Sequence, residues 1–198
     1  MKKLLIATTN QGKILEYREI FKDCALPVEL VTLEDLKIEA SVEEDGETFK
    51  ENAVKKAEFY AGLSGLPTLS DDAGLEIAYL NGEPGVHSRR WPCYRATDEE
   101  LMNLALKKLK GVPEEKRGAQ LRAVVGLSFP GEEKVYTFEG ILKGRIAEKP
   151  FQKTLAGYPF RSIFIPMGSE RYLGELHIVA HRKQAIEKAL PIIKKYLC

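Results

Sequence analysis

The chain has 198 residues, a length that fits one ordinary domain and suffices to bury a substantial core. Apolar residues make up 44% of the chain and charged residues 30%, a composition that excludes a disordered or fibrous protein. The formal net charge of +1 gives no overall attraction to nucleic acid or to a membrane surface, so we expect neither as a partner.

The first part of the chain alternates strand-like and helix-like segments. A continuous apolar run at 4–7 predicts a strand that is buried on both faces, and the following "TTNQGK" (8–13) predicts a loop. Apolar residues between Ile14 and Phe21 then recur at helical spacing, and residues 28–33 have the composition of a second strand.

An acidic loop and a second helix come next. The segment "SVEEDGETFKENAVKKAEFYAGLSG" (41–65) predicts a helix that ends near Gly62 or Gly65. Residues 66–69 and 74–79 predict two short strands, because both are apolar runs bounded by turn-forming residues.

Two adjacent aspartates lie between these two predicted strands. Asp71 and Asp72 are expected where the first strand leaves the sheet, and successive side chains on a strand point to opposite faces. A turn is the ordinary role of such a sequence, because Asp bonds its own backbone and Gly74 tolerates a positive φ angle. The residues alone therefore leave a turn and a functional pair as alternatives.

The middle of the chain begins with a loop and a helix. The segment "EPGVHSRRWPCYR" (83–95) is rich in turn-forming, cationic and aromatic residues and predicts a surface loop. Thr97, followed by three acidic residues, predicts the start of a helix whose apolar face runs from Leu101 to Leu109.

The remaining elements are mostly strands. Residues 120–129 and 135–142 predict an antiparallel hairpin with "PGEEK" at its tip, which Arg145 and Ile146 continue, and 162–166 predicts a short strand. Residues 181–197 predict a terminal helix bent at Pro191.

This order of elements predicts an α/β fold with a mixed central sheet flanked by helices. We expect a single domain over residues 1–198, with two lobes, the second being a β-rich hairpin lobe around 118–166.

The cysteines and the N-terminus bear on the compartment. Cys24, Cys93 and Cys198 are odd in number and far apart, so neither a disulfide framework nor a Cys-x-x-Cys metal site is indicated. The apolar stretch at the start is too short for a signal peptide, and no other stretch has the length needed to span a bilayer. We expect a cytoplasmic protein.

The loop at 8–13 has the features of an anion site. Free backbone N–H groups at the start of a helix attract anions, and Thr8, Thr9 and Asn10 add side-chain donors. Lys13 adds a positive charge in the first turn, where a cation opposes the helix dipole unless an anion is present. The alternative is plain capping by Asn10 with a solvated Lys13. The residues alone leave both alternatives open, and the position of Lys13 favours an anion; the candidate phosphate ligands are Thr8, Thr9, Asn10 and Lys13.

Carboxylates near this site predict a metal. A polyphosphate usually arrives with Mg²⁺, which is typically held by one or two carboxylates together with the phosphates. Glu43, Glu44, Asp71 and Asp72 are the candidate ligands. A solvated acidic helix start is the alternative interpretation of the glutamates.

Four motifs, "TTNQGK", "EEDGETFKENA", "SDDAGLEI" and "GEPGVHSRRW", occur in this order along the first half of the chain. In this order and spacing they resemble the inosine triphosphate pyrophosphatase family, which hydrolyses non-standard purine nucleoside triphosphates such as ITP, dITP and XTP. The resemblance extends over nearly the whole chain.

The resemblance implies a chemistry and roles for individual residues. A metal-activated water attacks the α-phosphorus, and the products are a nucleoside monophosphate and pyrophosphate. Thr8 to Lys13 would hold the triphosphate, Glu43 or Glu44 with Asp72 would hold Mg²⁺, and Asp72 would be the base. The other aspartate, Asp71, would organise the turn. The resemblance also implies a homodimer.

The match to the family weakens toward the C-terminus. In "LAGYPFRSIFIP", Tyr158 is kept, Ala156 replaces an aromatic residue, and the aspartate of the family's base pocket is missing. A lysine of that pocket is missing too, and Ala180 replaces a serine before His181 and Arg182. The resemblance implies base-binding roles for four residues, Ala73, Tyr158, His181 and Arg182, and the candidate replacements for the lysine are Arg161 and Lys153.

Two further functions remain as alternatives. One is a nucleotide-binding or sensor protein without turnover, against which the full set of carboxylates argues, because carboxylates beside a phosphate site repel an anion when no metal is present. The other is a related pyrophosphatase with an altered base preference, including one for modified pyrimidine nucleotides.

Overall fold

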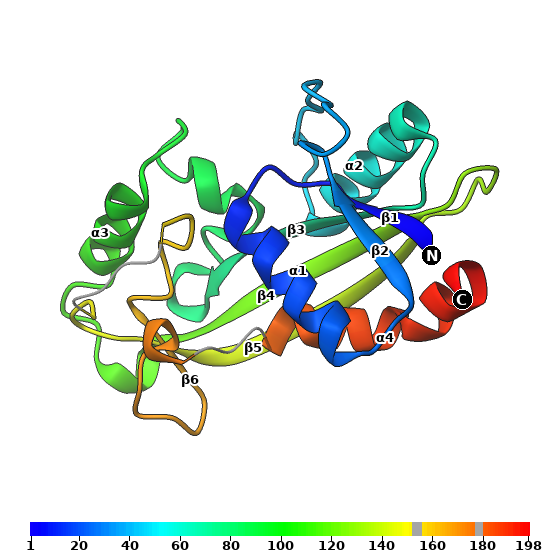
Figure 1. Cartoon of the computed structure of the whole chain (residues 1–198). Helices are drawn as coiled ribbons and strands as arrows, with labels where there is room; N and C mark the ends of the chain where they lie inside the picture. The colour runs from blue at the N-terminus through cyan, green and yellow to red at the C-terminus, as the bar shows by residue number, and fades with distance from the viewer. Residues whose placement is uncertain (152–155, 177–179) are drawn as a thin grey trace. The chain divides into compact units, whose positions relative to one another are not determined.

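The computed structural model of the chain describes residues 1–151, 156–176 and 180–198. Figure 1 shows its helices and strands in chain order. The strands are β1 (Lys2–Ile6), β2 (Val28–Thr32), β3 (Thr68–Ile77), β4 (Gly118–Ser128), β5 (Tyr136–Ile146) and β6 (Phe164–Pro166). The α-helices are α1 (Gln11–Asp23), α2 (Phe49–Ser64), α3 (Asp98–Lys108) and α4 (Ala180–Leu197). Short 3₁₀ helices lie at Ala78–Leu80, Gly85–Arg90, Glu114–Lys116 and Leu173–Glu175.

The described strands form one six-stranded sheet in the order β2-β1-β3-β4-β5-β6. The central strand β1 pairs in parallel with β2 on one side and with β3 on the other. The last pair, β5 and β6, is antiparallel. The sheet is therefore mixed, and with its helices it confirms the predicted α/β fold.

Most of the predicted elements are present within one or two residues of their expected bounds. Helix α2 begins after Thr48, whose hydroxyl accepts a hydrogen bond from the N–H of Glu51, and ends at Gly65 in the left-handed conformation. The sequence allowed an end at Gly62 or at Gly65, and the positive φ angle of Gly65 explains why the helix continues to the later glycine. Pro191 lies inside α4, as expected.

The turn predicted around Asp71 and Asp72 is wrong. The structure has one strand, β3, where we expected two short strands with a break between them, and both aspartates and Gly74 lie inside it. The residues prefer a turn locally, but hydrogen bonding of β3 to β1 and β4 in the sheet keeps this segment extended. Ile6 and Leu69 are register partners in the β1–β3 pair.

The surface loop expected at 83–95 is partly regular. Residues Gly85–Arg90 form a 3₁₀ helix, and Ser88 within it is buried. The hydroxyl of Ser88 accepts a hydrogen bond from the N–H of Leu75 and donates one to the carbonyl of Gly85. These bonds attach the segment to the end of β3.

The chain divides into two compact units. Unit 1 consists of Met1–Asp72, Ala123–Gly140 and His181–Cys198, and unit 2 of Ala73–Arg122 and Ile141–Ala180. The single domain and the hairpin lobe around 118–166 stay predictions.

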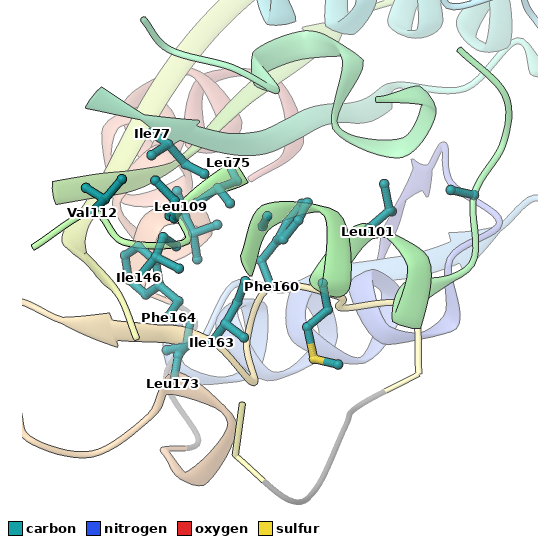
Figure 2. Close-up of a cluster of buried hydrophobic side chains, with 14 residues drawn as sticks. Leu75, Ile77, Leu101, Leu109, Val112, Ile146, Phe160, Ile163, Phe164 and Leu173 are labelled. Atoms are coloured by element: carbon teal, nitrogen blue, oxygen red, sulfur yellow. The ribbon is translucent and has the colours of Figure 1, made fainter. Parts of the chain in front are cut away.

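Each unit has its own apolar cluster. In unit 1, residues of β1 and β2 pack with Tyr60 of α2; the buried members are Leu5, Ala7, Val31, Leu33 and Tyr60. In unit 2, side chains from the end of β3, from α3 and from β6 pack together, as Figure 2 shows for Leu75, Leu101 and Phe164. No helix among the described residues has the length and apolar character required to cross a membrane.

Candidate functional site

The loop between β1 and α1 forms a capped helix start. Asn10 is the N-cap residue of α1, and its side-chain oxygen accepts hydrogen bonds from the N–H groups of Gly12 (2.9 Å) and Lys13 (3.3 Å). The N–H of Asn10 donates to the hydroxyl of Thr8 at 3.2 Å, and Thr9 is exposed. The capping interpretation of Asn10 is confirmed, and the amide nitrogen of its side chain is not part of that cap.

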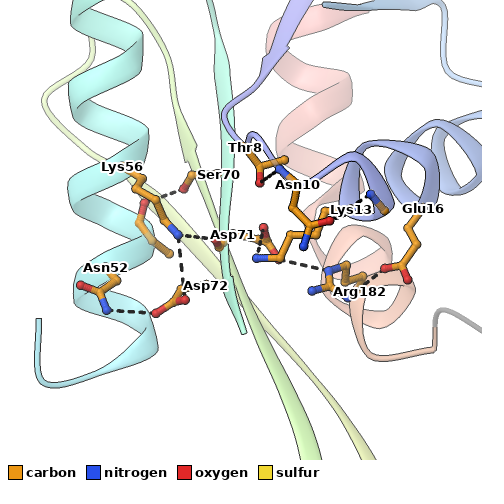
Figure 3. Close-up of polar contacts among 12 residues, drawn as sticks. Thr8, Asn10, Lys13, Glu16, Asn52, Lys56, Ser70, Asp71, Asp72 and Arg182 are labelled. Carbon is orange, nitrogen blue, oxygen red and sulfur yellow. Dashed lines mark hydrogen bonds and ion pairs between the residues drawn. The ribbon is translucent and has the colours of Figure 1, made fainter. Parts of the chain in front are cut away.

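Strand β3 directs its two aspartates to opposite sides, as Figure 3 shows. Asp71 points toward α1 and α4, where Lys13 Nζ lies 3.0 Å from its Oδ1 and Arg182 Nε lies 3.1 Å from its Oδ2. Asp72 points toward α2, where the side-chain amide of Asn52 donates to its Oδ2 at 3.0 Å. The strand geometry therefore separates the roles of the two carboxylates.

A buried chain of charges runs through Asp71. Arg182 binds Glu16 of α1 at 2.8 Å as well as Asp71, and all three side chains are almost completely buried. Burial alone would raise the pKa of Asp71, but Lys13 and Arg182 outweigh it and hold the pKa well below its usual value. Burial lowers the pKa of Lys13, which Asp71 opposes. Asp71 is therefore an ionised anchor for two cations.

The position of Lys13 has an explanation within the chain. A cation at a helix N-terminus opposes the dipole, so the sequence predicts a bound anion beside it. The structure pairs Lys13 with the carboxylate of Asp71 instead. The placement of Lys13 therefore does not by itself indicate a phosphate.

Lys56 is a component of the site that sequence reasoning missed. This lysine of α2 is only 7% exposed. Its ammonium donates to Glu44 at 2.9 Å and to the carbonyl of Asp71 at 2.6 Å, and lies 3.9 Å from Asp72 Oδ1. Burial lowers the pKa of Lys56, but Asp72 and Glu44 outweigh it and leave the pKa raised. The available signal was a lysine four residues from Asn52 and Tyr60, on the buried face of the helix.

Asp72 has the properties of a base. Burial raises its pKa, and although Lys56, Lys13 and Asn52 oppose this effect, the net pKa is above the usual aspartate value. A raised pKa brings a carboxylate closer to the range in which general bases work. Oδ2 accepts the hydrogen bond from Asn52, and Oδ1 is the oxygen that faces the ammonium of Lys56.

The four carboxylates proposed as metal ligands are not gathered in one place. Glu44 shares Lys56 with Asp72, whereas Glu43 is exposed, and no hydrogen bond or ion pair links it to another residue in the described ranges. Asp71 is occupied by Lys13 and Arg182. Within these ranges no group of three or more Asp, Glu, His or Cys side chains could hold a metal.

Mg²⁺ needs fewer protein ligands than that. One or two carboxylates suffice when phosphates and water complete its shell. Asp72 is a buried carboxylate whose raised pKa means that its charge is incompletely compensated, and Glu44 shares its cation, Lys56. This pair of oxygen donors fits Mg²⁺.

The candidate base-binding residues fall in both units. His181 and Arg182 start α4 in unit 1, and His181 Nε2 lies 3.1 Å from Arg182 Nη1. Ala73 and Tyr158 belong to unit 2, where the guanidinium of Arg161 lies 4.4 Å from the centre of the Tyr158 ring. Lys153 lies outside the described residues.

Comparison with known proteins covers almost the whole chain. The family model "Ham1 family" matches residues 4–192. The chain is 38% identical to a dITP/XTP pyrophosphatase of Geobacter sulfurreducens, covering 100% of this chain and 97% of that protein. It is 35% identical to a dITP/XTP pyrophosphatase of Bacillus subtilis, covering 98% of each.

Solved structures give the same result. The Staphylococcus aureus Ham1 protein superposes with a TM-score of 0.81 at 31% identity, covering 98% of this chain and 99% of that one. A nucleoside-triphosphatase described as a dITP/XTP pyrophosphatase from Mycobacterium abscessus gives a TM-score of 0.72 at 33% identity, covering 99% and 98%. The family resemblance of the four motifs is thereby confirmed: the chain belongs to the Ham1 family.

Proposed function

We propose that this protein is a nucleoside triphosphate pyrophosphatase that hydrolyses non-standard purine nucleotides such as ITP, dITP and XTP to the monophosphate and pyrophosphate. Membership of the Ham1 family and full-length similarity to dITP/XTP pyrophosphatases support this function. The structural observation that carries it is Asp72, a buried carboxylate with a raised pKa beside the ammonium of Lys56. Such a group is suited to accept a proton from water.

Each part of the site has a task in this reaction. Thr8, Thr9 and Asn10 offer polar groups at the start of α1, and we assign them with Lys13 to the phosphates. Lys13 would exchange its bond to Asp71 for one to a phosphate oxygen, while Arg182 continues to neutralise Asp71. This exchange keeps the buried carboxylate paired throughout.

Asp72 would act on the attacking water. Its Oδ1 accepts the proton as the water oxygen bonds to the α-phosphorus, and the bond from that phosphorus to the bridging oxygen breaks to release pyrophosphate. We assign Mg²⁺ to Asp72 and Glu44, where the ion supplies charge neutralisation on the phosphates and activation of the water. Lys56 orients both carboxylates through its contacts with them.

We assign base recognition in unit 1 to His181 and Arg182, and Tyr158 and Ala73 of unit 2 stay candidates from the sequence. His181 and Arg182 can donate hydrogen bonds to a purine 6-oxygen, which inosine, xanthosine and guanosine share and adenosine lacks. Two polar groups of the family's base pocket are missing from the sequence, and unpaired buried polar groups are what reject a wrong base strongly. We therefore expect 6-oxo purines to be preferred to ATP, with a narrow margin between ITP or XTP and GTP.

The decisive experiment is a measurement of pyrophosphate release. One preparation is given ITP, XTP, dITP, GTP, ATP and a modified pyrimidine triphosphate, each with Mg²⁺ and with a chelator, and kcat/KM is determined for each. We expect Mg²⁺-dependent release from the 6-oxo purines. Tight nucleotide binding without any release would instead support the nucleotide-binding protein, and a preference for the pyrimidine would overturn the purine assignment.

A cytoplasmic homodimer completes the proposal. Cys24, Cys93 and Cys198 are free thiols, which is compatible with a reducing compartment. The dimer rests on the family resemblance of the sequence. Light scattering coupled to gel filtration tests it, since the monomer mass is 22.2 kDa and a dimer has twice that mass.

A further inference from the structure

One buried side chain connects the acidic loop to the strand that carries Asp72. Asn52 lies in the first turns of α2 and is only 2% exposed. Its Oδ1 accepts a hydrogen bond from the backbone N–H of Gly46 at 2.8 Å, and its Nδ2 donates one to Asp72 Oδ2 at 3.0 Å (Figure 3 shows the second bond). The two ends of one amide therefore contact two segments that are far apart in sequence.

The acidic loop is pressed closely onto this amide. A Cβ atom at Gly46 would lie 2.8 Å from Asn52 Oδ1 and 2.8 Å from the Cβ of Glu51, closer than real Cβ contacts. The next N–H, that of Glu47, donates to Glu51 Oε2 at 2.7 Å. Two consecutive N–H groups thus attach the loop to the start of α2, two residues after Glu44.

Only an amide of this length suits both contacts. The backbone N–H of Gly46 needs an acceptor, and the carboxylate of Asp72 needs a donor, so the orientation of the Asn52 amide is determined by its partners. A carboxylate at this position would present an acceptor to Asp72, and an aliphatic side chain would leave both partners without this bond.

We propose that Asn52 is a positioning residue that fixes the loop bearing Glu44 relative to Asp72, so that both carboxylates face the metal of the bound Mg²⁺–triphosphate. The inference rests on the proposed function and deepens it. Asn52 acts through the two carboxylates and takes no part in proton transfer. Groups that orient metal-binding carboxylates typically change metal affinity about 10- to 100-fold when they are removed.

Two variants test the two ends of the connection. Asn52→Leu removes both hydrogen bonds without adding charge, and Gly46→Ala pushes the loop off the amide while Asn52 and Asp72 stay unchanged. Asn103→Leu, at an exposed site of α3, and Gly62→Ala, where an added Cβ meets nothing within 4 Å, are the matched controls.

The main readout is binding rather than turnover. Calorimetry measures the affinity of a non-hydrolysable α,β-methylene analogue of ITP with MgCl₂ and with a chelator, and the gain in affinity due to Mg²⁺ is compared among the proteins. In each variant we expect the increase in affinity caused by Mg²⁺ to be roughly tenfold smaller than in the wild type, while the affinity without Mg²⁺ stays at the wild-type value. The controls should keep the whole gain.

The Mg²⁺ dependence of turnover, measured in the single variants and in the double variant, completes the test. The Mg²⁺ concentration for half-maximal pyrophosphate release from ITP should rise roughly tenfold in both variants. Because both changes break the same connection, the double variant should need no more Mg²⁺ than Asn52→Leu alone. The inference would be overturned if Mg²⁺ increased the analogue affinity of Gly46→Ala as much as that of the wild type. It would also be overturned if the two substitutions raised the Mg²⁺ requirement additively in the double variant.

Failure of the inference and failure of the proposed function give different results. A wild-type protein that releases no pyrophosphate from any nucleotide contradicts the function, and the calorimetric comparison still decides the role of Asn52. If Asn52→Leu does not fold, Gly46→Ala alone decides it through the Mg²⁺-dependent gain. If the variants unfold at a lower temperature but keep the whole Mg²⁺-dependent increase in affinity, Asn52 is purely structural and the proposal is contradicted.

Discussion

At the scale of single residues, Asp71 and Asp72 differ through their surroundings rather than their chemistry. Both are aspartates in the same buried strand, yet the pKa of Asp71 is lowered by Lys13 and Arg182, and that of Asp72 is raised by burial. The first is therefore a permanent anion, and the second is poised to take up a proton. This contrast supports our proposal that Asp71 is a structural carboxylate and Asp72 the base.

The substitution Asp72→Asn tests the catalytic assignment. It keeps the shape and the acceptor for Asn52, but removes the group that takes up the proton, so kcat should fall by at least about a hundredfold. The unfolding temperature should not fall, because the raised pKa means that the folded state disfavours the charge being removed. A folded variant with nearly normal turnover would refute the role of Asp72.

Lys13→Ala separates phosphate binding from base binding. The affinity for a triphosphate should weaken strongly and that for the nucleoside should not, because the proposed mechanism assigns the lysine charge to the phosphates. Removing Lys13 also leaves buried Asp71 with one cation fewer, so stability should fall by about 1–3 kcal/mol. Affinities by calorimetry and urea unfolding measure the two effects.

The control for Lys13 is Lys3→Ala. Lys3 forms an exposed ion pair with Glu29 at 3.8 Å, and such pairs contribute little. Equal triphosphate affinity of Lys13→Ala and Lys3→Ala would show that Lys13 serves Asp71 alone.

At the scale of elements, the two glycines at the end of α2 have opposite requirements. Gly62 is inside the helix and an added Cβ would meet nothing within 4 Å, whereas Gly65 has a φ of +66° and ends the helix. Gly62→Ala should therefore stabilise the protein by about 0.5–1 kcal/mol, through a better helix propensity. Gly65→Ala should destabilise it by about 1 kcal/mol, because the left-handed conformation strains a side chain. Chemical unfolding of both variants checks the two signs.

The elements also show which features a sequence can predict. The sequence predicted the cap of α1 at Asn10 as one alternative and narrowed the end of α2 to Gly62 or Gly65, because caps and apolar spacing are local signals. Strand β3 was not, because "DDAG" prefers a turn and only pairing with β1 and β4 keeps it extended. Lys56 escaped notice because burial of a lysine depends on Glu44 and Asp72, which lie elsewhere in the sequence.

At the scale of the whole molecule, the two compact units differ in the kinds of side chains that they bury. Unit 2 has a large apolar cluster, and its buried Arg117 donates to the carbonyls of Ile146, Leu109 and Ala147. Unit 1 instead buries charged groups: one chain runs from Glu16 through Arg182 and Asp71 to Lys13, and Lys56 and Asp72 lie beside it. We therefore expect Asp71, the buried carboxylate of unit 1 with a lowered pKa, to contribute to the pH dependence of stability.

The direction of each pKa shift determines how stability depends on pH. The folded pKa of Asp71 lies below its unfolded value, so its ionised form contributes stability above a pH of about 4, and that contribution is lost as the pH falls below it. Protonation of Asp72 has the opposite effect on stability, because its pKa is raised in the folded state and protonation therefore favours folding. Asp71 should therefore account for part of the acid sensitivity, and Asp72 should oppose it.

The substitution Asp71→Asn isolates this contribution. The variant should be much less stable than the wild type at neutral pH, because Lys13 and Arg182 lose their shared anion inside the protein. The difference in the free energy of unfolding should shrink as the pH falls below about 4, because the carboxyl of the unfolded wild-type chain then takes up a proton that the folded carboxyl resists. Urea unfolding of both proteins at neutral and at acidic pH measures this difference. A difference that stays constant over the whole range would mean that the charge of Asp71 does not stabilise the fold.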